Sequence, residues 1–279
     1  MAGVHPALCP PQLPQEKRLM PRKHSRAALG AVLPLTLLLA ACGGGGTSAS
    51  YEGSILSGQV LMGAGQPVNG NGTGNVCLYA VTGGLGNPLN TSISPATNTG
   101  TLLTSGCIPT DANGNFSVNL KSFYGPVLIQ ITGGTFANVA GGTTSLSNLT
   151  STNASLQALV NIGGGGTVDA VVTPLTTIAT AMITPNTGLT LANYAAASSK
   201  VAAEFQLGGL NINAAPVSGD AYDKALRGVQ EYMAVAPAST DDPKANNLLT
   251  WNLTASNVQG DYTNAYNAIN NTALAFTFN

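Results

Sequence analysis

The chain of 279 residues is poor in the residue types on which most catalytic and metal sites depend. Only 8% of its residues are charged, and both histidines, His5 and His24, precede residue 27. From Cys42 onward, ten acidic residues accompany five basic ones and there is no histidine. Without an imidazole, this part cannot form a Ser-His-Asp or Cys-His catalytic system or a histidine-ligated metal site. Five dispersed cations cannot neutralise a phosphate backbone, so we expect no nucleic-acid partner.

The first 41 residues indicate export. Residues 21–26 are cationic, and residues 27–41 form an apolar run of 15 residues. This run is shorter than the ~20 residues that a membrane-spanning helix needs, so it predicts a signal peptide that is removed. Residues 1–19 are rich in proline and lie upstream of a complete signal, which makes Met20 the predicted true start.

The predicted signal ends in Leu39-Ala40-Ala41-Cys42, which resembles the lipobox of bacterial lipoproteins. The resemblance implies cleavage before Cys42, lipidation of its thiol and attachment to a lipid bilayer by several acyl chains, which anchor more firmly than one. Residues 42–50 are then the lipidated cysteine and a Gly/Ser tether. Gly43 in place of Asp implies, by the same resemblance, the bacterial outer membrane, on either of its faces. An ordinary secretory signal with a free thiol is the alternative.

Residues 51–172 have the pattern of an all-β domain. Short apolar runs alternate with stretches rich in Gly, Thr, Ser and Asn, which is typical of a sandwich or barrel. The pattern predicts strands over residues 53–62, 75–81, 116–120, 127–132, 155–162 and 167–172. Residues 111–115 (DANGN) predict a tight hairpin turn, because Asn-Gly readily adopts the positive φ values that such turns require.

Five segments of this region carry a family resemblance. They are SGQV at 57–60, GQPV at 65–68, VCLY at 76–79, TDANGNFSV at 110–118 and GPVLIQI at 125–131. Together they resemble the carboxypeptidase regulatory-like module, a transthyretin-like β-sandwich, which implies a non-catalytic spacer or binding unit. The spacing of Asp111, Asn113 and Asn115 also matches the start of a calcium loop. Such a loop needs Gly and Glu where this chain has Phe116 and Ser122, so a structural hairpin is favoured.

Cys77 and Cys107 are the two cysteines that follow Cys42. In an exported domain such a pair predicts a structural disulfide. A redox pair or a thiolate metal site is the alternative. However, the spacing is not C-x-x-C, and two thiolates without histidine leave a zinc site incomplete.

From residue 173 the apolar periodicity becomes helical. Thr173-Pro174 predicts a helix start, with Thr as N-cap and Pro at the first position, and we assign the next threonines to capping and to the helix surface. Further helices are predicted over residues 191–206 and 220–234, with one or two more within 244–270. Residues 273–278 predict a strand or a docked tail. The predicted fold is a transthyretin/Ig-like β-sandwich followed by a small α-helical domain over residues 173–279.

Two groups of side chains in the helical part could serve a function. Asp220/Asp223 and Asp241/Asp242 are close carboxylate pairs of the kind a glycosidase uses, but their positions at predicted helix starts favour a structural role. An aromatic set could line a sugar-binding surface, although core packing is favoured: Tyr222, Tyr232, Tyr262, Tyr266 and Trp251. We therefore assign no catalytic, cofactor-binding or metal-binding residue.

These patterns predict a non-enzymatic, membrane-anchored envelope lipoprotein that acts in binding, adhesion or envelope structure, with a protein or glycan ligand that the sequence leaves unidentified. The alternative is a carbohydrate- or peptide-binding accessory subunit of an envelope enzyme or transport system. A carboxylate-based hydrolase is the least favoured class.

Overall fold

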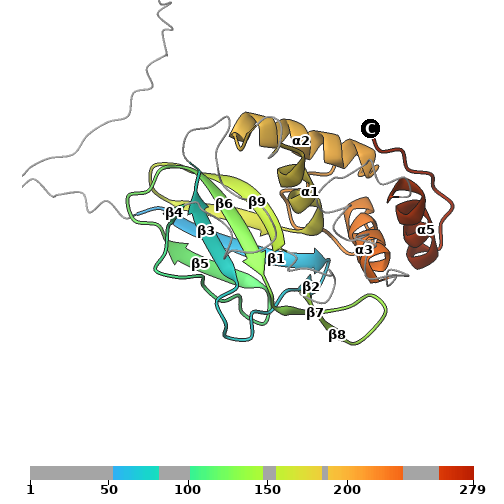
Figure 1. Ribbon diagram of the computed structural model, residues 1–279, viewed down its shortest axis with the longest axis horizontal. Coiled ribbons are helices and arrows are strands. Elements are labelled where there is room, and N and C mark those ends of the chain that lie inside the picture. The colour runs from blue at the N-terminus through green and yellow to red at the C-terminus, as the bar shows by residue number, and fades with distance from the viewer. Residues whose placement is uncertain (1–52, 82–100, 147–154, 184–187, 235–257) are drawn as a thin grey trace, which may run out of the picture. The chain divides into compact units, whose positions relative to one another are not determined.

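The computed structural model describes residues 53–81, 101–146, 155–183, 188–234 and 258–279, and residues 49–279 form one compact unit. The predicted signal peptide, Cys42 and the tether lie outside the described residues, as do Asp241, Asp242 and Trp251. Strands occupy the described chain up to residue 172, and helices follow from residue 174 (Figure 1). The fold is therefore of the β + α class, as predicted.

The first sheet is built around β1 (Ile55–Gly63). On one side β10 (Thr167–Val172) pairs with β1 in parallel, and on the other β5 (Asn115–Asn119) pairs with it antiparallel. β2 (Gln66–Pro67) pairs with the last residues of β1. Parallel pairing between the first and last strands of the β region needs a long connection, here the rest of that region.

The second sheet is antiparallel throughout, in the order β4-β3-β6-β9. Its strands are β4 (Thr101–Leu102), β3 (Val76–Ala80), β6 (Gly125–Thr132) and β9 (Ser155–Ile162). β7 (Thr135–Ala137) and β8 (Thr143–Ser145) form a separate hairpin. The six predicted strands are present. The short strands β2, β4, β7 and β8 were not predicted, because two or three residues carry no periodic pattern.

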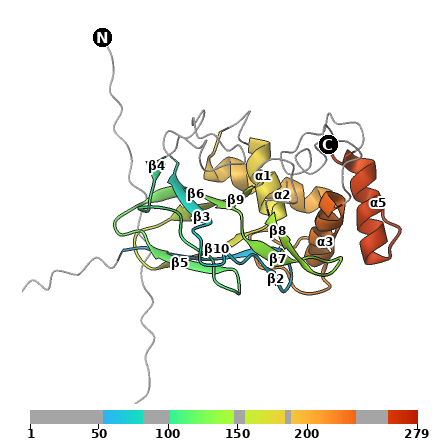
Figure 2. The same cartoon turned by 60° about the horizontal axis from the view of Figure 1, so that its bottom comes forward.

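Four helices lie in the described residues after β10: α1 (Pro174–Ile183), α2 (Leu191–Glu204), α3 (Ala221–Ala234) and α5 (Val258–Asn270). α1 packs against β9 and α2, while α3 packs against α5 and β1. Apolar side chains from the helices and from both sheets form one continuous core. Figures 1 and 2 both place the helices together at one end of the strands.

The predicted helix start at Thr173 is confirmed, but the threonines of α1 are buried. Thr173 Oγ1 accepts a hydrogen bond from the Thr176 N–H at 3.3 Å. Thr176, Thr177 and Thr180 are at most 5% exposed, so their predicted place on the helix surface is wrong. Thr177 Oγ1 donates to Thr173 O at 2.8 Å and accepts from the Gln157 N–H of β9 at 2.8 Å. Hydroxyls that bond to the preceding turn are satisfied inside the protein, which lets α1 enter the core.

The end of the chain is a docked tail, with no strand in residues 271–279. Phe276 and Phe278 are 2% and 9% exposed. Their rings lie 5.0 and 5.5 Å from that of Tyr262 on α5, centroid to centroid. The Gln206 side chain donates to Ala275 O at 2.6 Å. Of the two predicted forms of this segment, the docked tail is the correct one.

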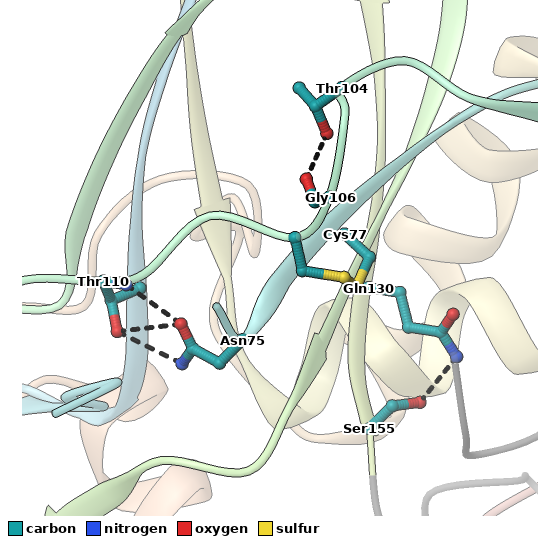
Figure 3. The surroundings of a disulfide bond; sticks show 8 residues. Asn75, Cys77, Thr104, Gly106, Thr110, Gln130 and Ser155 are labelled. Carbon is teal, nitrogen blue, oxygen red and sulfur yellow. Dashed lines mark hydrogen bonds between the residues drawn. A yellow bond between two sulfur atoms is a disulfide. The ribbon is translucent and has the colours of Figure 1, made fainter. Parts of the chain in front are cut away.

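Cys77 of β3 and Cys107 form the predicted disulfide, with their Cα atoms 4.4 Å apart (Figure 3). Beside it, the Asn75 side chain accepts from the Thr110 N–H at 2.9 Å and donates to Thr110 Oγ1 at 3.2 Å. Both pairs join β3 to the segment that precedes Asp111. They therefore set the position of the turn that borders the site described next.

Candidate functional site

The candidate site is a groove on the first sheet, which we call the sheet groove. Its volume is about 490 Å³. Residues of β1, β5 and β10 and of the turn before β5 line it: Ser57, Gly58, Gln59, Asp111, Asn115, Phe116, Ser117, Asp169, Ala170 and Val171. The groove lies where β1 meets both its parallel and its antiparallel partner.

Strand register places polar side chains in rows across this groove. Ser57 of β1 lies between Asp169 of β10 and Ser117 of β5. In the next outward row, Gln59 lies between Val171 of β10 and Asn115 of β5. Since successive side chains of a strand point to opposite faces, these residues share the face that is turned away from the core.

The opposite face of the same strands is apolar. Leu56, Phe116 and Ala170 are at most 5% exposed and belong to the core. Gly58 lies opposite Phe116, and a Cβ atom at position 58 would collide with the Phe116 ring. Because Gly58 has no side chain, the Phe116 ring can pack against β1 on the core side of the sheet. The ring is therefore not accessible to a ligand in the groove.

Two hydrogen bonds order the groove. Ser57 Oγ and Ser117 Oγ lie 3.2 Å apart, and Gln59 Nε2 donates to Asn113 O at 3.1 Å. A hydroxyl can donate one hydrogen bond and accept two, and a side-chain amide has both donors and acceptors. The serines and Gln59 therefore keep capacity for further hydrogen bonds to a ligand.

Asp111 holds the turn at one border of the groove. Its Oδ1 accepts from the N–H groups of Asn113 and Asn115, each at 2.8 Å. The hydrogen bond from the Asn115 N–H is the main cause that lowers the pKa of the Asp111 carboxyl, and bonds from the Asn113 N–H and the Asn115 side chain act in the same direction. Gly114 has a φ of 74°, as the Asn-Gly turn requires. The carboxylate serves the hairpin, as the sequence favoured.

The sheet groove combines apolar surface with hydrogen-bonding groups. Val171 contributes apolar atoms, and the polar side chains add hydroxyl, amide and carboxylate groups. None of its ten lining residues presents an exposed aromatic ring. Asp111 and Asp169 make its charge negative, which disfavours an anionic ligand. A neutral or cationic ligand with both apolar and hydrogen-bonding groups would find partners there.

The described carboxylate pair, Asp220 and Asp223, is structural. Asp220 accepts from the Asp223 N–H at 2.6 Å and from the Val217 N–H at 3.1 Å, and so caps α3 as predicted. Asp223 is 5% exposed and accepts from the N–H groups of Ala64 and Gly219, each at 2.9 Å. These bonds tie the helix start to the turn after β1 and leave no open cleft between the two carboxylates.

The described tyrosines of the candidate sugar-binding set lie in the core. Tyr222, Tyr232, Tyr262 and Tyr266 are at most 4% exposed. Desolvation by burial raises the pKa of Tyr222 and Tyr262 well above the usual value of 10.0. Core packing is therefore confirmed for these four residues, and they do not form a surface for a sugar.

Sequence reasoning did not single out the sheet groove. Ser57, Gln59, Asn115 and Ser117 alternate with apolar residues, which is a signal of outward-facing positions. That signal says which face each residue occupies but not which strands are neighbours. The pairing of β1 with β10, which brings Asp169 beside Ser57, could be found only from the tertiary structure.

No protein family matches this chain, and neither do the curated proteins or the solved structures compared with it. Among the helices of the described ranges, none combines the length and apolarity needed to cross a bilayer.

Proposed function

We propose that this protein is a non-enzymatic lipoprotein of the bacterial outer membrane that binds, through the sheet groove, a partner with both apolar and hydrogen-bonding groups. Acylated Cys42 holds it on the bilayer, and its β region is a transthyretin/Ig-like sandwich that presents the groove. The groove on an exposed sheet face is the observation that carries the binding role. The lipobox-like Leu39–Cys42 segment is what motivates the anchor.

Two features support a sandwich. Core residues come from both sheets, Leu56 and Phe116 from one and Leu78 and Ile129 from the other. In addition, the segments that resemble the carboxypeptidase regulatory-like module fall on β1, β2, β3, β5 and β6 and on the Asp111 turn.

A binding role agrees better with the groove than catalysis does. General acid–base chemistry needs a group whose pKa lies near the working pH. The Asp111 carboxyl has a lowered pKa and is engaged in its own turn. Asp169 is accompanied by serines and amides, without an imidazole to activate them. The carboxylates of α3 are engaged at the helix start, so we do not favour a hydrolase built on them.

The anchor is tested by metabolic labelling with an alkyne fatty acid in a Gram-negative host. The wild-type protein should take up the label and fractionate with outer membranes, because its thiol carries the acyl chains. The Cys42→Ser variant should take up none. A wild-type protein that is exported, unlabelled and freely soluble would refute the anchor.

The binding role is tested on arrays of bacterial glycans and peptides with the fluorescently labelled Cys42→Ser protein. Once a ligand is found, Ser117→Tyr should weaken its binding about tenfold or more, because the ring fills the groove from an exposed position. Thr167→Tyr is the matched control, since Thr167 is exposed on the same sheet but does not line the groove. Equal binding by the two variants would remove the groove from the proposal.

A further inference from the structure

Three segments meet at the end of the first sheet where β1 begins, and we call this region the Ser54 end. It comprises residues 53–55, the β5–β6 turn at 120–124 and the β9–β10 turn at 163–166. Ser54 joins them. Its N–H donates to Lys121 O at 3.1 Å, and its hydroxyl donates to Gly163 O at 2.6 Å and accepts from the Gly165 N–H at 3.1 Å.

The Ser54 end exposes an aromatic ring, an aliphatic side chain and a cation. Tyr124 is 49% exposed, Ile55 is 38% exposed, and Lys121 is also exposed. The three segments contain no carboxylate, and Glu52 directly precedes the first of them in the sequence. Gly164 lies against Tyr124, with the position of a Cβ atom 3.0 Å from the ring, so the absence of a side chain there gives the ring its place.

The opposite end of β1 has a different character. There Ala64 and Met62 bond to Asp223 and Gln230 of α3. The described helices and their connections carry five acidic residues, Glu204, Asp220, Asp223, Glu231 and Asp261, against three basic ones, Lys200, Lys224 and Arg227. An anionic surface would therefore repel the helical end more strongly than the Ser54 end.

The predicted anchor lies close along the chain to the Ser54 end. Ten residues separate Cys42 from Gly53, and a Gly/Ser-rich chain of that length has a root-mean-square span of about 16 to 19 Å. β1, with nine residues, runs for about 30 Å from the Ser54 end towards α3. In Figure 1 the helices lie at the far end of β1 from its start. Because the anchor already holds the protein at the membrane, contact between the protein surface and the lipid is an intramolecular step. Weak individual contacts are therefore enough to orient the protein on the membrane.

We propose that the Ser54 end rests on the membrane surface, with Tyr124 and Ile55 at the level of the lipid headgroups and Lys121 beside anionic phosphates. This inference depends on the proposed acylation of Cys42. Tyrosine favours the membrane interface because its ring is apolar and its hydroxyl polar, and a lysine near the surface is attracted to anionic lipid. β1 then points away from the bilayer, the sheet groove faces sideways and stays accessible, and the helices lie farthest out.

The test uses the full-length, acylated protein in vesicles of phosphatidylethanolamine and phosphatidylglycerol that contain a lipid brominated in its acyl chains. Tyr124→Trp is compared with Val217→Trp, which introduces the same ring at a 67% exposed site near the helices. Tryptophan fluorescence is measured, and the fluorescence of the wild-type protein, which has one Trp, is subtracted. The bromine atoms should quench the fluorescence of the introduced Trp about twofold in Tyr124→Trp, as expected for a ring at the interface. They should quench it little in Val217→Trp.

A second measurement leaves the wild-type surface intact. Hydrogen exchange of the backbone at residues 120–124 and 163–166 should slow when the acylated protein is bound to vesicles, and Lys121→Glu should reverse part of this effect. If both tryptophan variants float with the vesicles but are quenched equally, or exchange is unchanged, the membrane-facing Ser54 end is refuted while the anchor stands. If the wild-type protein is unacylated and does not float, the anchor itself fails and this inference fails with it.

Discussion

Side chains of individual residues add to the backbone hydrogen bonds that hold residues 107–110, which precede the Asp111 turn. Thr110 is buried, and its hydroxyl donates to Val68 O at 2.7 Å while its N–H donates to Asn75. The Cys77–Cys107 disulfide lies a few residues away (Figure 3). Because burial leaves no water to replace these partners, each contributes to the stability of the Asp111 turn and of the groove beside it.

At this scale we predict the effect of removing the disulfide. The Cys77→Ala/Cys107→Ala double variant should lower the free energy of unfolding by roughly 3 to 4 kcal/mol, because the bond closes a loop of 30 residues and restricts the unfolded chain. Urea unfolding of the oxidised wild-type protein and of the double variant measures the difference. The wild-type protein under reducing conditions is the control and should approach the variant. An unchanged midpoint in both would contradict a structural role.

Single elements are stabilised by the fit between facing strands. On β1, Gly58 has Phe116 of β5 on one side and Ala170 of β10 on the other. A Cβ atom at position 58 would collide with the Phe116 ring and lie 3.0 Å from Ala170 O. A central strand with close partners on both sides has little freedom to relax.

We therefore predict that Gly58→Ala lowers the free energy of unfolding by about 1 to 3 kcal/mol, the usual cost of overpacking. Gly163→Ala is the matched control, since its Cβ would meet nothing within 4 Å and its φ is not positive. That control should be neutral or slightly stabilising. Thermal or urea unfolding of both variants measures the difference in their free energy of unfolding. Equal values would contradict the prediction and show that β5 can shift to make room for the methyl group.

At the scale of the whole molecule, residues 49–279 behave as one body because helices and sheets share a core. Gln230 of α3 donates to Met62 O of β1 at 2.9 Å, and Tyr222 donates to Ile212 O at 2.7 Å while bonding to Thr173 at 2.8 Å. The sheets cannot lose the helices without exposing these groups and the apolar faces beneath them. A single cooperative unfolding transition is expected for residues 49–279.

The free energy of unfolding should fall at alkaline pH, because the core contains buried tyrosines. Burial raises the pKa of Tyr194, Tyr222 and Tyr262 above the ordinary value of 10.0. Below pH 10 these tyrosines are neutral in both states, and their contribution is fully present. Above it the unfolded chain loses its phenolic protons first, so the free energy of unfolding falls as pH rises.

Denaturant unfolding at pH values on both sides of 10, with tyrosinate absorbance followed in parallel, tests this prediction. The buried tyrosines should ionise together with unfolding and not before it. Tyr262→Phe serves as the comparison, because it removes one of these groups and should make the decline of stability with pH less steep. A stability that stays constant across pH 10 would contradict the burial of these rings.

The sequence by itself determined the local features of this protein. Period-two and helical patterns located the main strands and helices, Asn-Gly located a turn, Thr173 and Asp220 marked helix starts, and the two cysteines of the β region allowed one pairing. Each of these depends on a residue and its near neighbours along the chain. Only the tertiary structure decided that β10 pairs with β1, that α1 buries its threonines, and that one core unites helices and sheets. Those outcomes depend on how distant segments share apolar surface and hydrogen bonds, which no local pattern specifies.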